Sequence, residues 1–115
     1  MTLDAHEALS MREQQEDTVK EHIAAALDEV IEDLLGKPVI EALHAYLLER
    51  GVSRTNLATK VQILCSALDA AFGDTSPAIQ RTIARRLYAK LNLNFVPIEG
   101  AGLVEYLRKA SRIKV

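Results

Sequence analysis

The sequence of 115 residues has no tryptophan, one cysteine, three prolines and five glycines. Because the lone Cys65 has no partner for an internal disulfide, we expect a cytoplasmic protein. So few glycines and prolines disfavour an all-β domain, which needs many tight turns. No apolar run approaches the roughly 20 residues that cross a bilayer. The first ten residues also lack the basic and apolar regions of a signal peptide, so no membrane segment is expected.

The residues that are present favour helices. Apolar residues make up 49% of the chain and charged residues 26%, which is typical of a globular domain. Alanine and leucine are abundant, and both have high helix propensity. A chain of this length can bury one core without metals or disulfides. We therefore predict an all-α fold, a compact five-helix domain with a long N-terminal helix.

Glycine and proline mark the expected ends of these helices. Gly36 and Gly73 each follow an apolar-periodic segment, where a left-handed cap needs a residue without Cβ. Pro38 and Pro77 fit the first turn of the next helix, where a missing N–H costs nothing, and Ser76 is the expected N-cap before Pro77. The predicted helices span residues 4–35, 38–50, 55–72, 77–92 and 102–113.

The first predicted helix consists of two parts. Residues 18–35 carry a broad apolar stripe at helical spacing and belong to the main domain, 18–115. Residues 1–17 form a helical extension whose stretch REQQED, residues 12–17, has no apolar residue. The preferred interpretation is one continuous helix; the alternative is a break near residue 17.

An apolar stripe on a helix that leaves its core needs a cover, and a second copy of the chain is the simplest one. We therefore expect a homodimer in which the long first helix supplies much of the interface. The alternative is an N-terminal arm that folds over its own domain. The candidate dimer stripe consists of Leu9, Val19, Ile23, Ala26 and Val30.

Several apolar segments stand in a familiar order. The segments are LLGKPVIEAL, LLERGV, LDAAFG, IARRLYAKLNLNF and LVEYLRKA. Over roughly residues 31–111 the chain resembles the Nitrosopumilus output domain family, a small helical module. The resemblance implies a signal-output or interaction role and brings no catalytic residues with it.

The residue patterns predict no enzyme, cofactor or metal site. Cys65 lies among apolar neighbours, where an inert buried thiol is expected. The histidines His6, His22 and His44 do not converge with other strong ligands at the spacing a zinc site needs. Acidic pairs one turn apart within residues 28–33 fit a solvated face.

Charge is divided unevenly along the chain. Residues 1–50 hold 12 acidic and 4 basic side chains, a net −8, whereas residues 51–115 hold 4 acidic and 10 basic ones, a net +6. The two halves are expected to attract each other, within one chain or across a dimer. A nucleic-acid surface is the competing interpretation.

The basic side chains near residue 85 separate into two pairs on a helical wheel. Arg81 and Arg85 lie on one shoulder of the apolar arc, and Arg86 and Lys90 on the other. Salt bridges to the acidic first helix compete with nucleic acid for these cations. The candidate basic interaction surface consists of Arg81, Arg85, Arg108, Lys109 and Arg112.

These observations predict a non-enzymatic signal-output or protein-interaction module with a protein partner in a regulatory pathway. The runner-up is a nucleic-acid-binding regulator that uses the basic surface. A third hypothesis is a small-ligand pocket under residues 91–102, which we expect to lie on the core as an extended lid.

Overall fold

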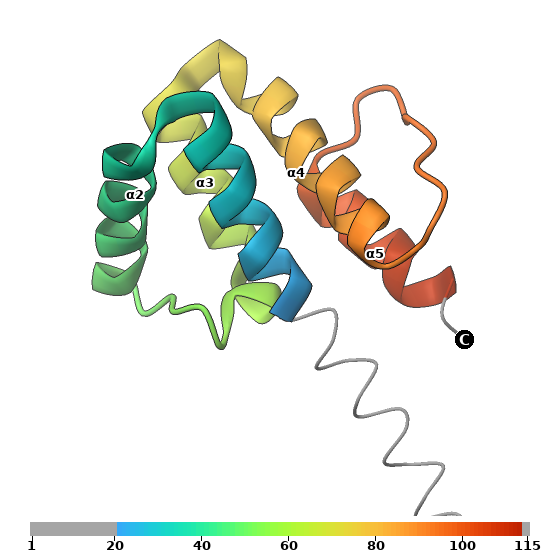
Figure 1. The fold of residues 1–115 in the computed structure, drawn as a ribbon, viewed down its shortest axis with the longest axis horizontal. Helices are drawn as coiled ribbons and strands as arrows, with labels where there is room; N and C mark the ends of the chain where they lie inside the picture. The colour runs from blue at the N-terminus through green and yellow to red at the C-terminus, as the bar shows by residue number, and fades with distance from the viewer. Residues whose placement is uncertain (1–20, 114–115) are drawn as a thin grey trace, which may run out of the picture.

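The computed structural model describes residues 21–113 and the side chains of residues 21–110. The described chain is all-helical and compact, without a β-strand (Figure 1), which confirms the all-α part of the prediction; the five-helix count and the long N-terminal helix stay predictions. A helix over residues 21–35 is called helix 21–35 below. The other elements are α2 (Lys37–Glu49), a 3-10 turn (Leu57–Lys60), α3 (Val61–Phe72), a 3-10 turn (Gly73–Thr75), α4 (Ser76–Lys90) and α5 (Leu103–Ile113). The predictions for residues 1–20, including the continuity of the first helix and the domain boundary after residue 17, lie outside the described residues.

A single residue joins helix 21–35 to α2. Gly36 has a φ of 95°, a conformation that side chains with a Cβ rarely adopt. Its N–H donates to the carbonyl oxygen of Glu32 at 2.9 Å, which ends the first helix. Pro38 then lies in the first turn of α2, as predicted. The chain therefore turns sharply at this point, and α2 runs beside helix 21–35 (Figure 1).

The predicted helix 55–72 is wrong at its beginning. Leu57–Lys60 form a 3-10 turn, and the α-helix starts only at residue 61. Asn56 explains the delay, because its side-chain oxygen accepts the Ser53 N–H at 2.7 Å and its amide donates to the Gly51 carbonyl at 3.0 Å. Such local bonds between side chain and backbone compete with helix formation.

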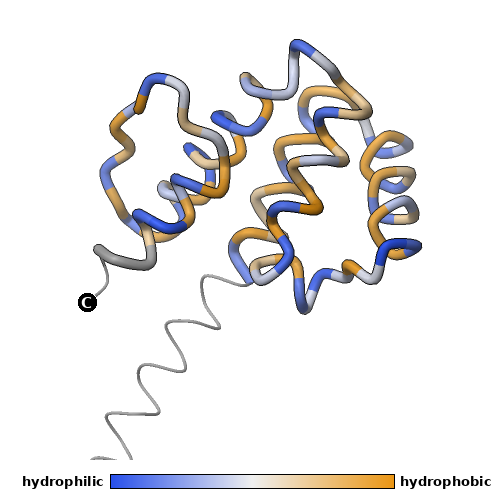
Figure 2. Tube along the Cα trace, turned by 180° about the vertical axis from the view of Figure 1, so that it is seen from behind, coloured by the Kyte–Doolittle hydropathy of each residue, from blue (hydrophilic) through white to orange (hydrophobic). Residues whose placement is uncertain are grey.

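One apolar core joins all the described helices. α3 lies between α2 on one side and α4 and α5 on the other, and helix 21–35 packs across it (Figure 1). Apolar residues alternate with polar ones around each helix, as the amphipathic pattern predicts (Figure 2). The core includes Ile23, Leu27, Ile31, Leu43, Leu47, Leu64, Leu68, Ile83, Leu87 and Leu103.

The loop over residues 91–102 brings the chain back to the first half of α4. Gln80 of α4 accepts the N–H of Leu103, the first residue of α5, at 3.0 Å. Since α5 starts beside the first half of α4 and not beside its end, the loop has to return along most of that helix. Figure 1 shows the loop as a wide arch on the side of the molecule away from α2.

Aromatic rings hold this loop on the core. Phe95 packs edge-on against Tyr88 at a centroid distance of 5.5 Å, and its ring is tilted by 32° against that of Tyr106 at 5.0 Å. The Tyr88 hydroxyl donates to the Tyr106 carbonyl at 2.6 Å, and the Tyr106 hydroxyl accepts the Ile98 N–H at 2.8 Å. The expected cover over the core is therefore present, and three rings occupy the space beneath it.

No helix among the described residues is long and apolar enough to cross a membrane.

Candidate protein-docking groove

The predicted chemistry of Cys65 agrees with its surroundings. The side chain is half-buried rather than fully buried. Burial raises the pKa of the thiol to about 11, and the nearby carboxylate of Asp69 adds to the increase. A thiolate nucleophile needs the opposite shift. Among residues 21–110, no group of three or more histidine, cysteine, aspartate or glutamate side chains is placed to hold a metal ion.

The expectation of a solvated acidic face on residues 28–33 is wrong at three of its four acids, of which Asp33 pairs with Arg86 at 3.3 Å. Asp28 contacts Nε2 of His44 on α2 at 2.5 Å and also pairs with Arg54. Glu29 accepts hydrogen bonds from Arg86 at 2.9 Å and from Lys90 at 2.6 Å. Contacts between segments far apart in the sequence thus use charges that a helical wheel places on the outside.

The two shoulders of basic residues on α4 have different surroundings. Arg86 and Lys90 pair with the acidic helix 21–35, as expected for attraction between the halves of the chain. Arg85 lies over the ring of Phe95, with 5.3 Å from the guanidinium carbon to the ring centroid. Arg81 is exposed and has no ion pair within the described part of the chain.

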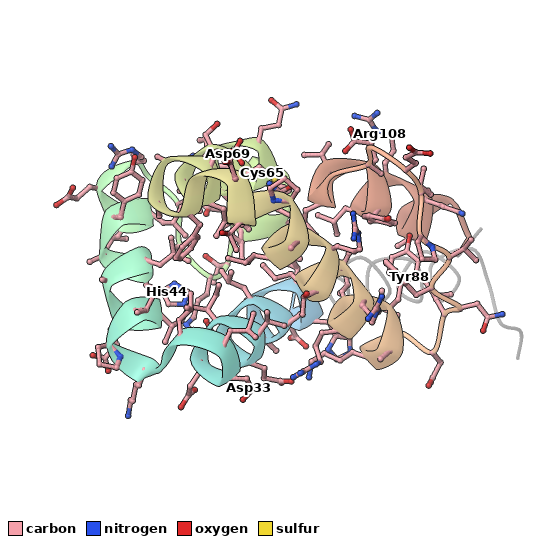
Figure 3. The ribbon with its side chains drawn as sticks, turned by 90° about the horizontal axis from the view of Figure 1, so that it is seen from above. Asp33, His44, Cys65, Asp69, Tyr88 and Arg108 are labelled. Carbon is pink, nitrogen blue, oxygen red and sulfur yellow. The ribbon has the colours of Figure 1, made fainter. Side chains whose placement is uncertain are left out.

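The cations of α5 complete the candidate basic surface only in part. Arg108 and Lys109 are exposed and have no carboxylate partner among the described side chains. Arg108 lies at the same edge of the molecule as Asp69 and Cys65 of α3 (Figure 3). The side chain of Arg112 lies outside the described residues.

Three residues of the candidate dimer stripe belong to the core of a single chain. Ile23 and Ala26 are fully buried, and Val30 is 1% exposed. Their own chain already covers them, so they are not available to a second copy in this structure. Leu9 and Val19 lie outside the described residues.

The pair formed by α2 and α3 has a flank that no other described element covers, called the uncovered flank below. His44 of α2 is directed towards helix 21–35, where it meets Asp28 (Figure 3). Tyr46 lies two positions later, about 200° around the same helix, and therefore borders the opposite flank. The pair is thus covered by helix 21–35 on one flank and carries Tyr46 on the other.

A groove with a volume of about 300 Å³ lies on this uncovered flank. Side chains from α2 and the second half of α3 form its walls, and all of them are apolar apart from the hydroxyl of a tyrosine. Tyr46 is 37% exposed, so its ring is open to a binding partner. The lining residues are Val39, Ala42, Leu43, Tyr46, Ala67, Ala70, Ala71 and Phe72.

A second hollow of about 320 Å³ continues the groove towards the start of α3. The two hollows share Tyr46 and Ala67 in their walls, so we treat them as one surface, the α2–α3 groove. Among the described side chains, Arg50 is the one charged group that lines either hollow. Its guanidinium lies 3.4 Å from the centroid of the Tyr46 ring and donates to the Tyr46 carbonyl at 3.3 Å.

Sequence reasoning missed this groove. Alanine is compatible with a core, a surface and a helix contact, so the pair Ala70 and Ala71 appears ordinary in the sequence. The available signal was on α2, where Val39, Ala42 and Tyr46 follow helical spacing beside the core residue Leu43.

Comparisons with family models, with curated proteins and with solved structures give no match for this chain. The resemblance to the output domain family therefore stays a prediction.

Proposed function

We propose that the chain is a non-enzymatic protein-interaction module that binds an amphipathic helix of a protein partner in the α2–α3 groove. The observation that carries this proposal is a groove with an apolar half and a more polar half, which no part of the described chain covers. Uncovered apolar surface of this kind marks binding sites in soluble proteins. An apolar stripe laid between two helices is a recurring mode of peptide recognition.

The lining of the groove supports a helix over a small molecule. Small-ligand sites combine apolar walls with several convergent polar groups that orient the ligand. The apolar half of the groove has only the Tyr46 hydroxyl. Ala70 and Ala71 have short side chains, which allow the backbone of a partner helix to come close to α3, within the usual 8–10 Å between packed helix axes.

A regulatory setting follows from the resemblance to the output domain family and belongs to the same proposal. A cytoplasmic location and a homodimer also remain proposals. Since Ile23, Ala26 and Val30 are buried in one chain, a dimer would need contact residues other than these three.

The test is a selection of helical peptides from a display library against the wild-type chain and against Ala71→Glu. Ala71 is exposed on α3, so glutamate places a charge in the groove without entering the core. We expect wild-type binders with an apolar stripe and at least a tenfold loss of affinity for the variant, since the charge would be buried without a partner.

Ala89→Glu provides the matched control, because Ala89 is an exposed alanine on α4. This variant should bind the selected peptides as the wild type does, and circular dichroism should show equal helicity for all three chains. Peptides that bind Ala71→Glu and wild type equally would contradict the proposal.

A second candidate function is nucleic-acid binding. It is supported by Arg81, Arg108 and Lys109, which are exposed and have no carboxylate partner in the described part of the chain. Phosphate contacts of this kind give retention on DNA that weakens with salt. Retention at low salt that falls for Arg81→Gln with Lys109→Gln would support this function; no retention at low salt would contradict it.

A further inference from the structure

We propose that residues 4–11 of the same chain occupy the α2–α3 groove, so that a protein partner has to displace them. This inference deepens the proposed function, because it names what covers the groove before a partner binds. It rests on the groove's lining, on its one charge and on the length of chain before residue 21.

The first argument is the fit between apolar surfaces. Residues 4–11 read DAHEALSM. On a helix, Ala5, Ala8 and Leu9 share one stripe, with Leu9 as the one large branched side chain. The groove offers the complement, since three of the four α3 side chains in its apolar half are alanines and three of the four α2 side chains are larger apolar residues. Two short alanines against an alanine wall allow close packing, and Leu9 has a site among the larger side chains.

The second argument is charge. Arg50 is the one charged residue in the lining of the groove, and no described carboxylate pairs with it. Residues 4–11 carry Asp4 and Glu7 and no cation. Asp4 precedes Leu9 by about 7.5 Å along a helix, and Arg50 follows Leu43 by about 10.5 Å. An acid of the segment therefore reaches Arg50 while Leu9 stays in the apolar half.

The third argument is reach. Residues 12–20 connect the segment to helix 21–35 and span up to about 30 Å when extended. Helix 21–35 begins beside the turn that precedes α3, at the end of the molecule where α2 ends (Figure 1). The groove lies on the flank of the α2–α3 pair opposite helix 21–35, so the connection has to pass around one helix of this pair, which is about 10 Å in diameter. Nine residues are long enough for that path.

The tether also decides between this segment and other occupants. A segment joined by a short linker acts at an effective concentration in the millimolar range. Even a weak contact of the segment is therefore favoured over a free partner or a second copy at micromolar concentration. The consequence is an autoinhibited module whose partner competes with the first residues of its own chain.

The test uses the full chain with Cys65→Ser and a nitroxide spin label at position 6 (His6→Cys). Position 6 lies beside the apolar stripe, so the label stays outside the groove. The amide NMR signals of Ala42, Ala70 and Ala71 should lose most of their intensity. The signals of Val96 and Ile98, in the loop on the side away from α2, should be unaffected.

A mixed sample distinguishes the chain's own segment from that of a second copy. In it, an isotope-labelled chain without nitroxide is combined with an unlabelled chain that carries nitroxide. We expect no loss of signal at Ala70 or Ala71. Broadening in this sample would show a second copy in the groove and would overturn the proposal.

Two substitutions test the contact between Leu9 and the α2–α3 groove. Leu9→Asp should restore the signals of Ala70 and Ala71, whereas Ser10→Asp, off the stripe, should leave them broadened. Broadening that persists in Leu9→Asp, or its absence in the parent chain, would overturn the inference.

Peptide affinity then distinguishes this inference from the proposed function. Peptides selected on the wild-type chain should bind Leu9→Asp at least tenfold more tightly than wild type. Equal affinity for these two chains, with weak binding to Ala71→Glu, would leave the proposed function standing and overturn only the inference. Equal affinity for Ala71→Glu and wild type would contradict the proposed function, whatever the spin label reports.

Discussion

Cys65 illustrates how position decides the chemistry of a single side chain. Its thiol lies on α3 close to the start of α5, half-buried and near the Asp69 carboxylate. Removal from water disfavours a thiolate, and a neighbouring negative charge disfavours it further. Together they raise the pKa of the thiol to about 11, with burial as the larger cause. The residue therefore acts as a small apolar group in the packing between helices.

We predict that Cys65 reacts slowly with iodoacetamide at pH 8. At a pKa of about 11, roughly one thiol in a thousand is ionised at this pH, against roughly one in four at the ordinary pKa of about 8.5. The ionised fraction is thus about 250-fold lower than in the unfolded chain, but a thiolate of higher pKa is more nucleophilic, which offsets about tenfold of this difference. The rate should therefore be lower than that of the unfolded chain in urea by about tenfold to a hundredfold. Mass spectrometry of timed samples measures both rates, and equal rates would contradict the assignment.

At the scale of elements, a buried amide fixes the start of α5. Gln80 accepts the Leu103 N–H, and its own amide donates to Ser76 at 3.0 Å and to Asp69 at 3.4 Å. Three helices thus meet at one side chain. The prediction of Ser76 as an N-cap is wrong, because the residue lies inside α4, fully buried, with its hydroxyl bonded to Gln80.

We predict that Gln80→Ala destabilises the fold by about 1–3 kcal/mol, because the buried Leu103 N–H and the Ser76 hydroxyl lose their partner. Gly102→Ala tests the same contact from the other side, since a Cβ there would lie 2.9 Å from the Gln80 side-chain oxygen. We expect this substitution to cost about 1 kcal/mol or more in wild type and less in Gln80→Ala. Urea unfolding of wild type, the two single variants and the double variant gives the coupling energy between the two substitutions. Strictly additive costs would contradict the contact between Gly102 and the Gln80 side chain.

Local signals in the sequence explain how much of the arrangement of helices could be predicted. Gly36, Pro38 and Pro77 mark helix boundaries by backbone geometry alone, and these boundaries are confirmed. The start of α3 was missed because Asn56 bonds to a loop whose shape is not visible in the sequence. The groove was missed because nothing in the sequence indicates whether Ala70 and Ala71 are covered by another helix.

At the scale of the whole molecule, ion pairs connect the acidic first half of the chain to the basic second half. Glu29 accepts from Arg86 and Lys90, and Asp33 accepts from Arg86 at 3.3 Å. The uneven distribution of charge predicted such attraction, but only the folded chain specifies which cations take part. Arg81, on the opposite shoulder of α4, pairs with none of the described carboxylates.

We predict that Glu29→Gln lowers the free energy of unfolding at pH 7 by up to about 1 kcal/mol, the usual range for exposed pairs. The hydrogen bonds from Lys90 and Arg86 hold the pKa of Glu29 below its ordinary value of 4.5. The stabilisation by the ionised Glu29 is therefore present above pH 4.5 and is lost as the pH falls through the lower pKa of Glu29 in the folded state. Urea unfolding at several pH values should show the wild-type and variant curves converging in acid.

Glu32→Gln is the control, because Glu32 is exposed on the same helix without an ion pair in the described structure. It should change stability less than Glu29→Gln at pH 7. In 1 M salt the effect of Glu29→Gln should shrink, because exposed charges are screened. An effect of Glu29→Gln that is the same at pH 3 and pH 7 would contradict the prediction.

The packing of helix 21–35 against the distant α4 has a consequence during synthesis. The Glu29 side chain meets Lys90, which is 61 residues further along the chain. At translation rates of about 5–20 residues per second, α4 follows helix 21–35 out of the ribosome by roughly 3–12 s. For that interval the buried face formed by Ile23, Leu27 and Ile31 lacks its final cover. Chaperones that bind exposed apolar segments should therefore meet this nascent chain at its first helix.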